Sequence, residues 1–221
     1  MAGYIVYWPG EQVKKLKKAG DTGPIRVVLG SIHAKMPAIS SVKPGDVVYP
    51  VTLEKGVLQV LARLPVERVE SAFDYLLRET GDRRAALIPR GVAYEEMWST
   101  GPIFLCGDEI RYYENPEELP PAVTRVEYLA ARRPAAHLAH EEPFNCCAKT
   151  AVSGSGGSPI RPRPIPAEKI PSLLFGSSKA KQKPLKLNAQ GKLTSLSLAG
   201  VTRRMSDETK LYFDTLFDGE T

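Results

Sequence analysis

The stretch Val42-Lys-Pro-Gly-Asp-Val-Val-Tyr-Pro-Val, residues 42–51, decides the fold expected for this chain. Pro44-Gly45 predicts a tight turn, and the Asp46 side chain can cap the backbone of that turn. The hydrophobic residues that follow predict a strand, which runs to a second turn at Lys55-Gly56. Residues 57–64 then return as a second strand. The pattern therefore predicts a β-hairpin with a short, glycine-containing loop.

Further short elements are predicted on both sides of this hairpin. They are a strand over 3–8, an amphipathic helix over 11–19 stopped by Gly20, a strand within 24–30, a helix from Glu70 to Gly81, a strand over 193–198 and a final helix over 206–217. Many short strands, tight turns and few helices are typical of a small sheet that bends or closes. We therefore expect an α+β protein built on a small bent or closed β-barrel, with short helices flanking it.

The chain of 221 residues is long enough for one domain with a substantial insertion. We expect a single domain over 1–221, in which residues 70–145 form an insertion on the main sheet. Residues 146–204 form a separate basic segment. The odd count of three cysteines argues against a disulfide framework.

Charge is strongly segregated along the chain. Residues 146–204 hold eleven Lys or Arg residues and one acid, Glu168, whereas residues 1–145 hold 18 basic and 19 acidic residues. A net charge of one sign within a quarter of the chain favours a polyanionic partner. The alternative interpretation is a flexible, solvated loop that aids solubility.

The basic segment divides into parts that could contact phosphates. Ser153-Gly-Ser-Gly-Gly157 could bring backbone N–H groups close to a phosphate, although no Gly-Lys-Ser/Thr follows as a Walker A loop requires. Alternating prolines over 158–166 forbid a helix and predict an extended arm, and a lysine-rich loop follows. Our predicted phosphate-binding residues are Arg161, Arg163, Lys179, Lys181 and Lys183.

Two pieces of the chain resemble the PUA-like superfamily, especially its EVE and ASCH branches. The first is the Gly45-Asp46 turn with the strands on either side of Gly56, which is similar to the family's lysine, glycine, aspartate and strand signature. The second is the order of a proline-led Ile165-Pro element, a basic loop, a last strand and a short helix. The resemblance covers residues 1–69 and 158–217, and the middle of the chain departs from the compact family pattern.

This resemblance implies a non-catalytic reader of nucleic acid that holds a modified or flipped base at the mouth of the barrel. Tyr7, Trp8, Tyr49 and Trp98 are the aromatic residues that we expect near such a pocket. Stacking on aromatic rings would offset the cost of extruding a base. The alternative is that these rings fill the core.

Polar groups of the same pocket are expected from Ser31 and His33. These residues lie between the predicted strand within 24–30 and the Gly45-Asp46 turn. In EVE-like domains this position often supplies polar pocket groups. The predicted base-binding set is therefore Tyr7, Trp8, Ser31, His33 and Trp98, and a structural role for His33 is the alternative.

Two other classes of protein remain open. His137 and His140 are spaced i, i+3 and could share a metal ion on a helix, which would suit a metal-dependent nuclease or another hydrolase, but no third ligand is evident. No Gly-x-Ser-x-Gly nucleophile motif with a usable base appears. The other alternative is an assembly subunit that docks the basic segment on an acidic protein. For the leading hypothesis we expect DNA or RNA as partner, and no cofactor or metal.

No apolar run in the sequence approaches the roughly 20 residues that span a bilayer. The first residues lack the charged start and long apolar stretch of a signal peptide. We therefore expect a reduced cytoplasmic protein that makes no membrane contact.

Overall fold

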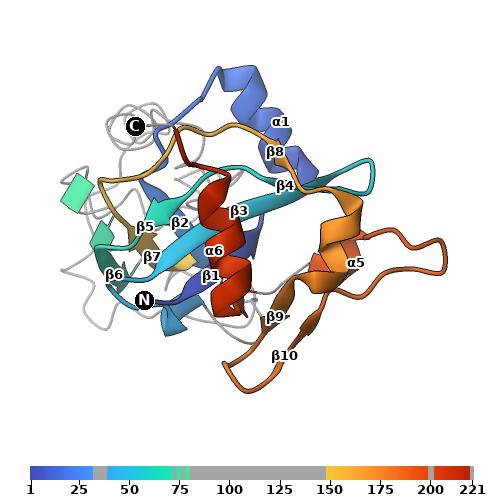
Figure 1. Cartoon of the computed structure of the whole chain (residues 1–221). Helices are drawn as coiled ribbons and strands as arrows, with labels where there is room; N and C mark the ends of the chain where they lie inside the picture. Colours follow the sequence, from blue (N-terminus) through green and yellow to red (C-terminus); the bar gives the residue numbers. More distant parts are fainter. Residues whose placement is uncertain (32–38, 72–73, 76–77, 80–147, 199–201, 220–221) are drawn as a thin grey trace, which may run out of the picture.

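A computed structural model describes residues 1–31, 39–71, 74–75, 78–79, 148–198 and 202–219 (Figure 1). The strands are β1 (Gly3–Tyr7), β2 (Val27–Ser31), β3 (Val47–Glu54), β4 (Val57–Val60), β5 (Leu64–Pro65), β6 (Arg68–Ser71), β7 (Ala148–Ser153), β8 (Arg163–Pro164), β9 (Leu174–Gly176), β10 (Gln182–Pro184) and β11 (Thr202–Met205). The helices are α1 (Gly10–Ala19), α5 (Ser195–Leu198) and α6 (Asp207–Thr215), with 3-10 turns at η1 (Ile39–Ser41) and η5 (Ala167–Ser172).

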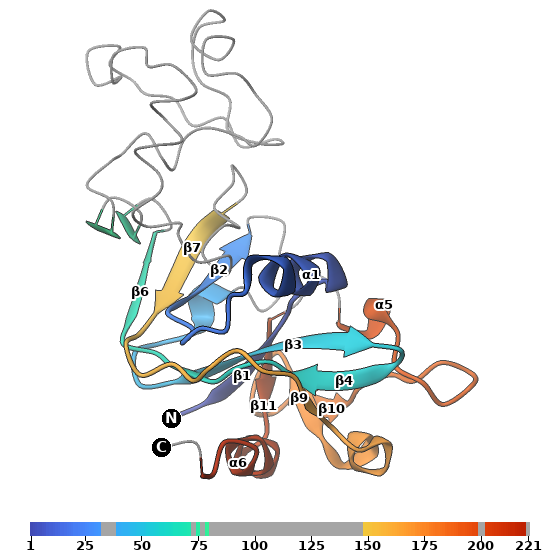
Figure 2. The ribbon, with the colours of Figure 1, turned by 90° about the horizontal axis from the view of Figure 1, so that it is seen from above.

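The larger sheet has the strand order β10-β9-β11-β1-β3-β4-β8, with β5 pairing against β3. β1 and β3 are parallel, and the other pairs in this sheet are antiparallel. The sheet curls into a half barrel, with α6 against one face (Figure 2). These features confirm a mixed α+β protein with a bent sheet and short helices.

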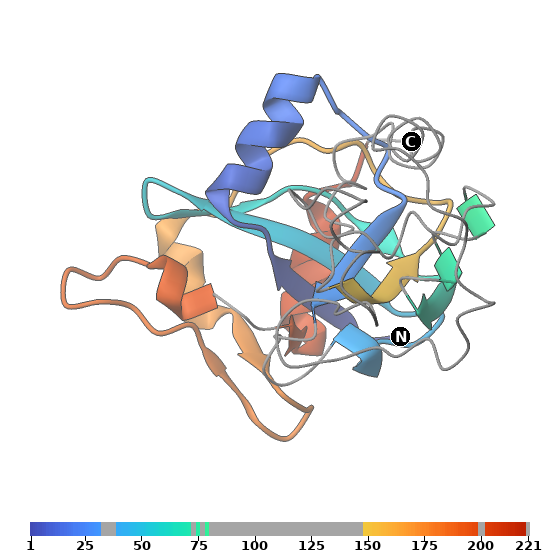
Figure 3. The ribbon, with the colours of Figure 1, turned by 180° about the vertical axis from the view of Figure 1, so that it is seen from behind.

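The smaller sheet has the order β2-β7-β6 and lies with α1 across the other face of the larger sheet (Figure 3). β6 pairs antiparallel with β7, so residues 72–147 connect two neighbouring strands. The predicted insertion and the predicted helix from Glu70 to Gly81 lie largely outside the described residues. Glu70 itself belongs to β6, so that helix does not begin there.

Two hydrophobic clusters occupy the two faces of the larger sheet. Tyr4 and Val48 are neighbours in the β1–β3 ladder and belong to the cluster shared with the smaller sheet and α1. The next pair, Ile5 and Tyr49, belongs to the cluster under α6. Because side chains alternate between the faces of a strand, β1 and β3 are buried on both sides.

The central hairpin forms, but its second strand is shorter than the predicted 57–64, because β4 ends at Val60 and Leu64–Pro65 belong to β5. β3 and β4 pair antiparallel through a turn at Lys55-Gly56, where both residues take positive φ values of 50° and 83°. Asp46 accepts hydrogen bonds from the backbone N–H groups of Lys43 (3.0 Å) and Ala2 (2.7 Å), so it caps its own turn and also ties down the start of the chain. The turn chemistry at Gly45 and Gly56 therefore sets the register of the sheet centre.

Both predicted terminal helices are confirmed. α1 ends at Gly20 in the left-handed conformation, with φ at 64°. α6 begins at Ser206, whose side chain accepts a hydrogen bond from the Thr209 N–H at 3.1 Å. The prediction of a strand over 193–198 is wrong, because Ser195–Leu198 form α5 and the last strand is β11.

None of the helices in the described part of the chain is both long enough and apolar enough to cross a membrane.

Candidate nucleic-acid interface

The described structure contains an open, basic groove of about 870 Å³. It lies where the β9–β10 hairpin, the chain leading into α5 and the last strand β11 come together. Its lining residues are Lys183, Pro184, Lys186, Leu187, Asn188, Thr194, Leu196, Ser197 and Arg203. Three of these side chains are cationic, and no acidic side chain lines the groove among the described residues.

Strand register directs two of the cations to the same side. Lys183 in β10 lies opposite Phe175, and Arg203 in β11 lies opposite Ile5. Directly opposite residues in an antiparallel pair share a face of the sheet. Phe175 and Ile5 both belong to the cluster under α6, so Lys183 and Arg203 project on this same face, at the rim of the core.

Arg203 is held in place by the start of α5. One guanidinium nitrogen donates to the Ser197 carbonyl at 2.8 Å, and the Ser197 hydroxyl donates to the Lys186 carbonyl at 2.6 Å. Burial lowers the pKa of Arg203, because desolvation disfavours the charged form. The pKa of an arginine side chain is normally above 12, so Arg203 stays charged at neutral pH. Arg203 thus supplies an ordered cation to the floor of the groove.

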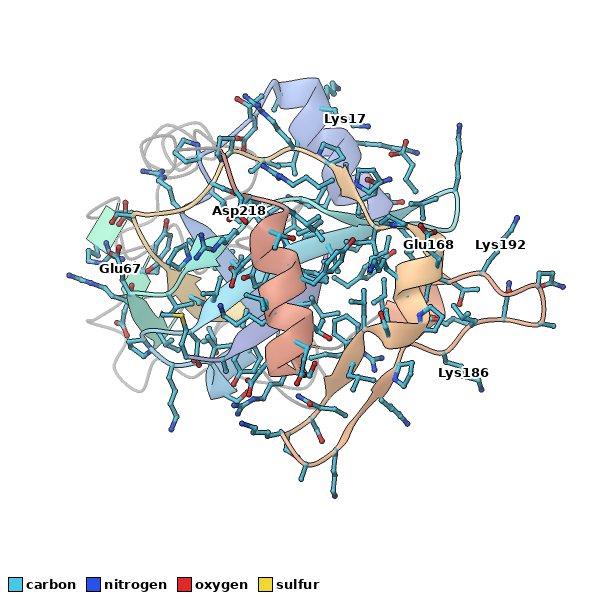
Figure 4. The ribbon with its side chains drawn as sticks, in the orientation of Figure 1. Lys17, Glu67, Glu168, Lys186, Lys192 and Asp218 are labelled. Carbon is cyan, nitrogen blue, oxygen red and sulfur yellow. The ribbon has the colours of Figure 1, made fainter. Side chains whose placement is uncertain are left out.

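The loop that carries Lys186 is braced by Asn188. The Asn188 side-chain oxygen accepts hydrogen bonds from the N–H groups of Gln190 (3.0 Å) and Lys192 (2.8 Å). Figure 4 shows Lys186 and Lys192 on opposite sides of this projecting loop, pointing away from one another. The loop therefore presents Lys186 to the groove and Lys192 to its other side.

The structure does not bring the five predicted phosphate-binding residues together. Lys183 lines the groove, and Lys181 lies in the turn before it. The exposed Lys179 forms an ion pair with Asp207 at 3.0 Å. Arg161 and Arg163 lie on or next to β8, at the other end of the strand order from β10.

Arg163, one of the predicted phosphate-binding residues, makes several contacts within the protein. Its guanidinium carbon lies 4.1 Å from the centre of the Phe217 ring. The same group donates to the carbonyls of Leu61 (3.2 Å) and Arg161 (2.9 Å). A cation over an aromatic ring is attracted by the negative face of that ring. Arg163 therefore links β8 to Phe217, which follows α6. The Arg161 side chain is exposed.

The glycine loop over 153–157 binds an anion that belongs to the protein itself. Glu67 accepts hydrogen bonds from the N–H (3.0 Å) and the hydroxyl (2.5 Å) of Ser155. These two bonds lower the pKa of Glu67. A Cβ at Gly154 would lie 2.1 Å from the Pro65 carbonyl oxygen, and one at Gly157 would lie 1.8 Å from the Ile25 carbonyl oxygen. The glycines therefore permit close packing against neighbouring strands, and the Ser155 donors are already used.

The predicted aromatic pocket does not form around Trp8 and Tyr49. Trp8 is 7% exposed and belongs to the core cluster beside α1, and Tyr49 is fully buried and donates a 2.6 Å hydrogen bond to Asp214. Tyr7 is half-buried against the other cluster. These rings fill the core, which is the alternative that the sequence left open. The backbone of Ser31 ends β2.

The other predicted base or metal residues, His33, Trp98, His137 and His140, lie outside the described residues. Within the part of the chain that the structure describes, no group of three or more His, Cys, Asp or Glu side chains is placed to hold a metal ion.

Sequence reasoning found the basic segment but missed how its cations meet. Lys186 and Arg203 were counted in the charge of the segment and were not singled out. One sequence signal points to Arg203. It stands beside Arg204 shortly before the Ser206 cap of the final helix, which is where a last strand would run and pair with the first strand.

Comparison with protein-family models, with curated proteins and with solved structures finds no match to the chain. The architecture is that of a mixed α+β protein with a curled half-barrel sheet, a second small sheet on one face and a basic groove at one edge.

Proposed function

We propose that the chain is a non-catalytic nucleic-acid-binding module whose basic groove contacts the phosphate backbone. The observation that carries the proposal is the convergence of Lys183, Lys186 and Arg203 on one open groove without an acidic side chain in its described lining. Each cation placed near a phosphate releases a condensed counterion, which favours binding. Arg203 adds a positive charge that its hydrogen bond to the Ser197 carbonyl holds in the groove.

The groove also offers contacts for the less polar parts of a nucleic acid. Pro184, Leu187 and Leu196 line it beside the cations, and Leu196 is 87% exposed. An apolar strip between cations suits a sugar or the face of a base. The proposed binding takes place at this groove. The core residues Trp8 and Tyr49 do not contact the nucleic acid in this proposal.

We propose further that the half barrel is a divergent PUA/EVE-like fold. Its support is the order of elements: the Gly45-Asp46 turn and the β3–β4 hairpin, then η5, a basic hairpin, β11 and α6. The resemblance implies a proline-led element, a basic loop, a last strand and a short helix, and here the β9–β10 hairpin and α5 stand between η5 and β11. Residues 72–147 are additional to this order of elements, and they are inserted at one place in the chain, between β6 and β7.

Charge reversal in the groove tests the nucleic-acid proposal. Fluorescence anisotropy would follow binding of labelled 20-nucleotide single strands and duplexes, of DNA and of RNA, to the wild type and to a Lys183→Glu/Lys186→Glu variant. Reversing two cations at phosphate contacts should weaken binding at least tenfold, which corresponds to about 1.4 kcal/mol.

The matched control is Lys14→Glu/Lys17→Glu, which makes the same change of charge at two exposed positions of α1. Figure 4 shows Lys17 on this helix, away from Lys186. We expect this protein to bind like the wild type apart from a small, salt-sensitive loss. Equal losses in the two variants would contradict a specific groove, as would unaltered binding by the groove variant.

A further inference from the structure

A second hollow lies across the projecting loop from the basic groove. It has a volume of about 180 Å³. Its lining residues are Lys55, Gly56, Val57, Leu58, Ile165, Ala167, Ile170, Leu187, Gly191, Lys192 and Leu193. Leu187 lines both hollows, but their cationic residues are different. The pocket can therefore be tested independently of the proposed nucleic-acid groove.

The walls of this pocket are aliphatic. Leu58, Ile165, Ile170 and Leu193 are buried members of the cluster under α6, so the pocket is an opening in the surface of that core. None of the described residues that line it carries a ring, a hydroxyl or a side-chain amide. A nucleobase is usually recognised by stacking and by hydrogen bonds to its edge, so this lining suits a base poorly. It suits an aliphatic group, which gains free energy from burial alone.

The mouth of the pocket is cationic. Lys55 lies in the β3–β4 turn, and its side chain is exposed. The stem of Lys192 crosses this turn: its Cβ and Cδ are each 3.8 Å from the position that a Cβ on Gly56 would take. No acidic residue lines the pocket among the described residues. Two lysine residues therefore line an otherwise aliphatic opening, beside the partly exposed Val57.

The size of the pocket selects the kind of occupant. Sites that enclose whole small molecules have volumes of about 300–1,000 Å³. A dry cavity of about 150 Å³ holds one benzene molecule. A pocket of about 180 Å³ therefore accommodates one large aliphatic side chain.

We propose that this pocket binds an acidic peptide segment of a protein partner, with one leucine-sized aliphatic side chain inserted and carboxylates on either side contacting Lys55 and Lys192. Charge complementarity favours carboxylates at the mouth, and the aliphatic lining favours the inserted side chain. This interaction surface goes beyond the proposed nucleic-acid function and does not depend on it.

The experiment compares two fluorescein-labelled peptides that differ only in the anchor, Glu-Glu-Asp-Leu-Asp-Glu-Glu and the same peptide with alanine in place of leucine. We expect wild-type protein to bind the leucine peptide at least tenfold more tightly. Equal affinity for the two peptides would show attraction by charge alone and would overturn the proposal. Absence of measurable binding at millimolar peptide would overturn it as well.

Two variants separate the anchor from the charges. Ala167→Leu places extra bulk in the pocket at an exposed position, so it should abolish the preference for leucine while retaining the weak binding of the alanine peptide. Lys55→Glu/Lys192→Glu should weaken binding of both peptides at least tenfold. Circular dichroism verifies that each variant is folded.

Lys183→Glu/Lys186→Glu should keep the tenfold preference for leucine, since these lysines line the other hollow. A leucine preference that survives in Ala167→Leu would refute the assignment of this pocket. A mononucleotide can be added as a competitor. If it displaces the peptide, and if Ala167→Leu leaves that displacement unchanged, the pocket holds a base and the proposal is contradicted.

Discussion

Asp214 connects α6 to the centre of the larger sheet. It accepts hydrogen bonds from the Tyr49 hydroxyl and the Lys210 ammonium group, each at 2.6 Å, and pairs with Arg63 at 3.2 Å. Burial acts to raise the pKa of Asp214, but the bonds from Lys210 and Tyr49 outweigh it and hold that pKa below its ordinary value. Burial, followed by the bond to Asp214, raises the pKa of Tyr49.

We therefore expect Asp214→Asn to lower the free energy of unfolding by about 1.5–3 kcal/mol at pH 7, the range for hydrogen bonds to charged groups. The carboxyl pKa is lower in the folded protein than in the unfolded chain, where it is about 3.9. The ionised carboxylate therefore contributes its full stability above the pKa of the unfolded chain, and this contribution is lost as the pH falls through the pKa of the folded protein. The difference between variant and wild type should therefore shrink below about pH 4.

Urea denaturation between pH 3 and pH 7 measures this difference. Asp218→Asn is the control, because Asp218 is an exposed acid shortly after the same helix (Figure 4). A loss at Asp214 that did not vary with pH would disprove the ionic part of this account.

Arg161 and Arg163 form a natural matched pair two residues apart. Arg163 stacks on Phe217 and donates to two carbonyls, whereas the Arg161 side chain is exposed. We expect Arg163→Ala to cost about 1–2 kcal/mol of stability, the range for a partly desolvated cation–π contact. Arg161→Ala should change stability by less than about 0.5 kcal/mol. Similar thermal denaturation of the two variants would show that the Phe217 contact does not hold the chain end.

At the level of elements, the β9–β10 hairpin supplies one wall of the groove. Its strands approach so closely that a Cβ on Gly176 would lie 1.7 Å from the Lys181 carbonyl oxygen. Gly176 also lies opposite Arg204 in β11. The hairpin and the last strand therefore meet at a position where only glycine fits.

Gly176→Ala should consequently lower the free energy of unfolding by about 1–3 kcal/mol, the usual cost of overpacking, and should weaken nucleic-acid binding with it. Gly10→Ala is the control. A Cβ at Gly10 meets nothing within 4 Å, and alanine favours the start of α1. Chemical denaturation that leaves Gly176→Ala as stable as Gly10→Ala would contradict the close approach.

Some elements could be predicted because their signals are local. The β3–β4 hairpin depends on Gly45, Asp46 and Gly56, and α6 depends on its Ser206 cap, so a few adjacent residues determine each. A charged loop is predicted over 179–183, where the structure begins β10, because the turn over 177–181 lacks the Asn-Gly or Asp-Gly pair that would indicate a hairpin. The alternating leucines of 193–198 read as a strand, although the Ser197 N–H bonds the Thr194 carbonyl at 2.9 Å and closes a helical turn.

The groove could not be predicted from local signals. Lys183 and Arg203 share a face only because β10, β9, β11 and β1 pair in that order, which is a long-range property of the sheet. Trp8 closes the first predicted strand, which favours a pocket position at a barrel end, and Tyr49 is a second aromatic residue expected near that pocket. The second sheet and α6, which cover them, come from distant parts of the chain.

At the level of the whole molecule, the net charge of +5 comes from the basic segment over 146–204, which holds eleven basic residues and one acid. The acidic and basic residues of 1–145 nearly balance, while the basic segment supplies all three cations of the groove. Such a field accelerates encounter with a polyanion and makes affinity strongly dependent on salt.

The most direct test of phosphate binding at the groove is a salt titration. The affinity of the wild type and of Lys183→Gln/Lys186→Gln for a labelled strand is measured from 50 to 300 mM salt. Each phosphate contact contributes about −0.7 to the slope of log affinity against log salt for a single strand and about −0.9 for a duplex. Loss of two contacts should therefore make the slope shallower by about 1.4 on a single strand and about 1.8 on a duplex. An unchanged slope would show that these lysines do not contact phosphates and would contradict the proposed function.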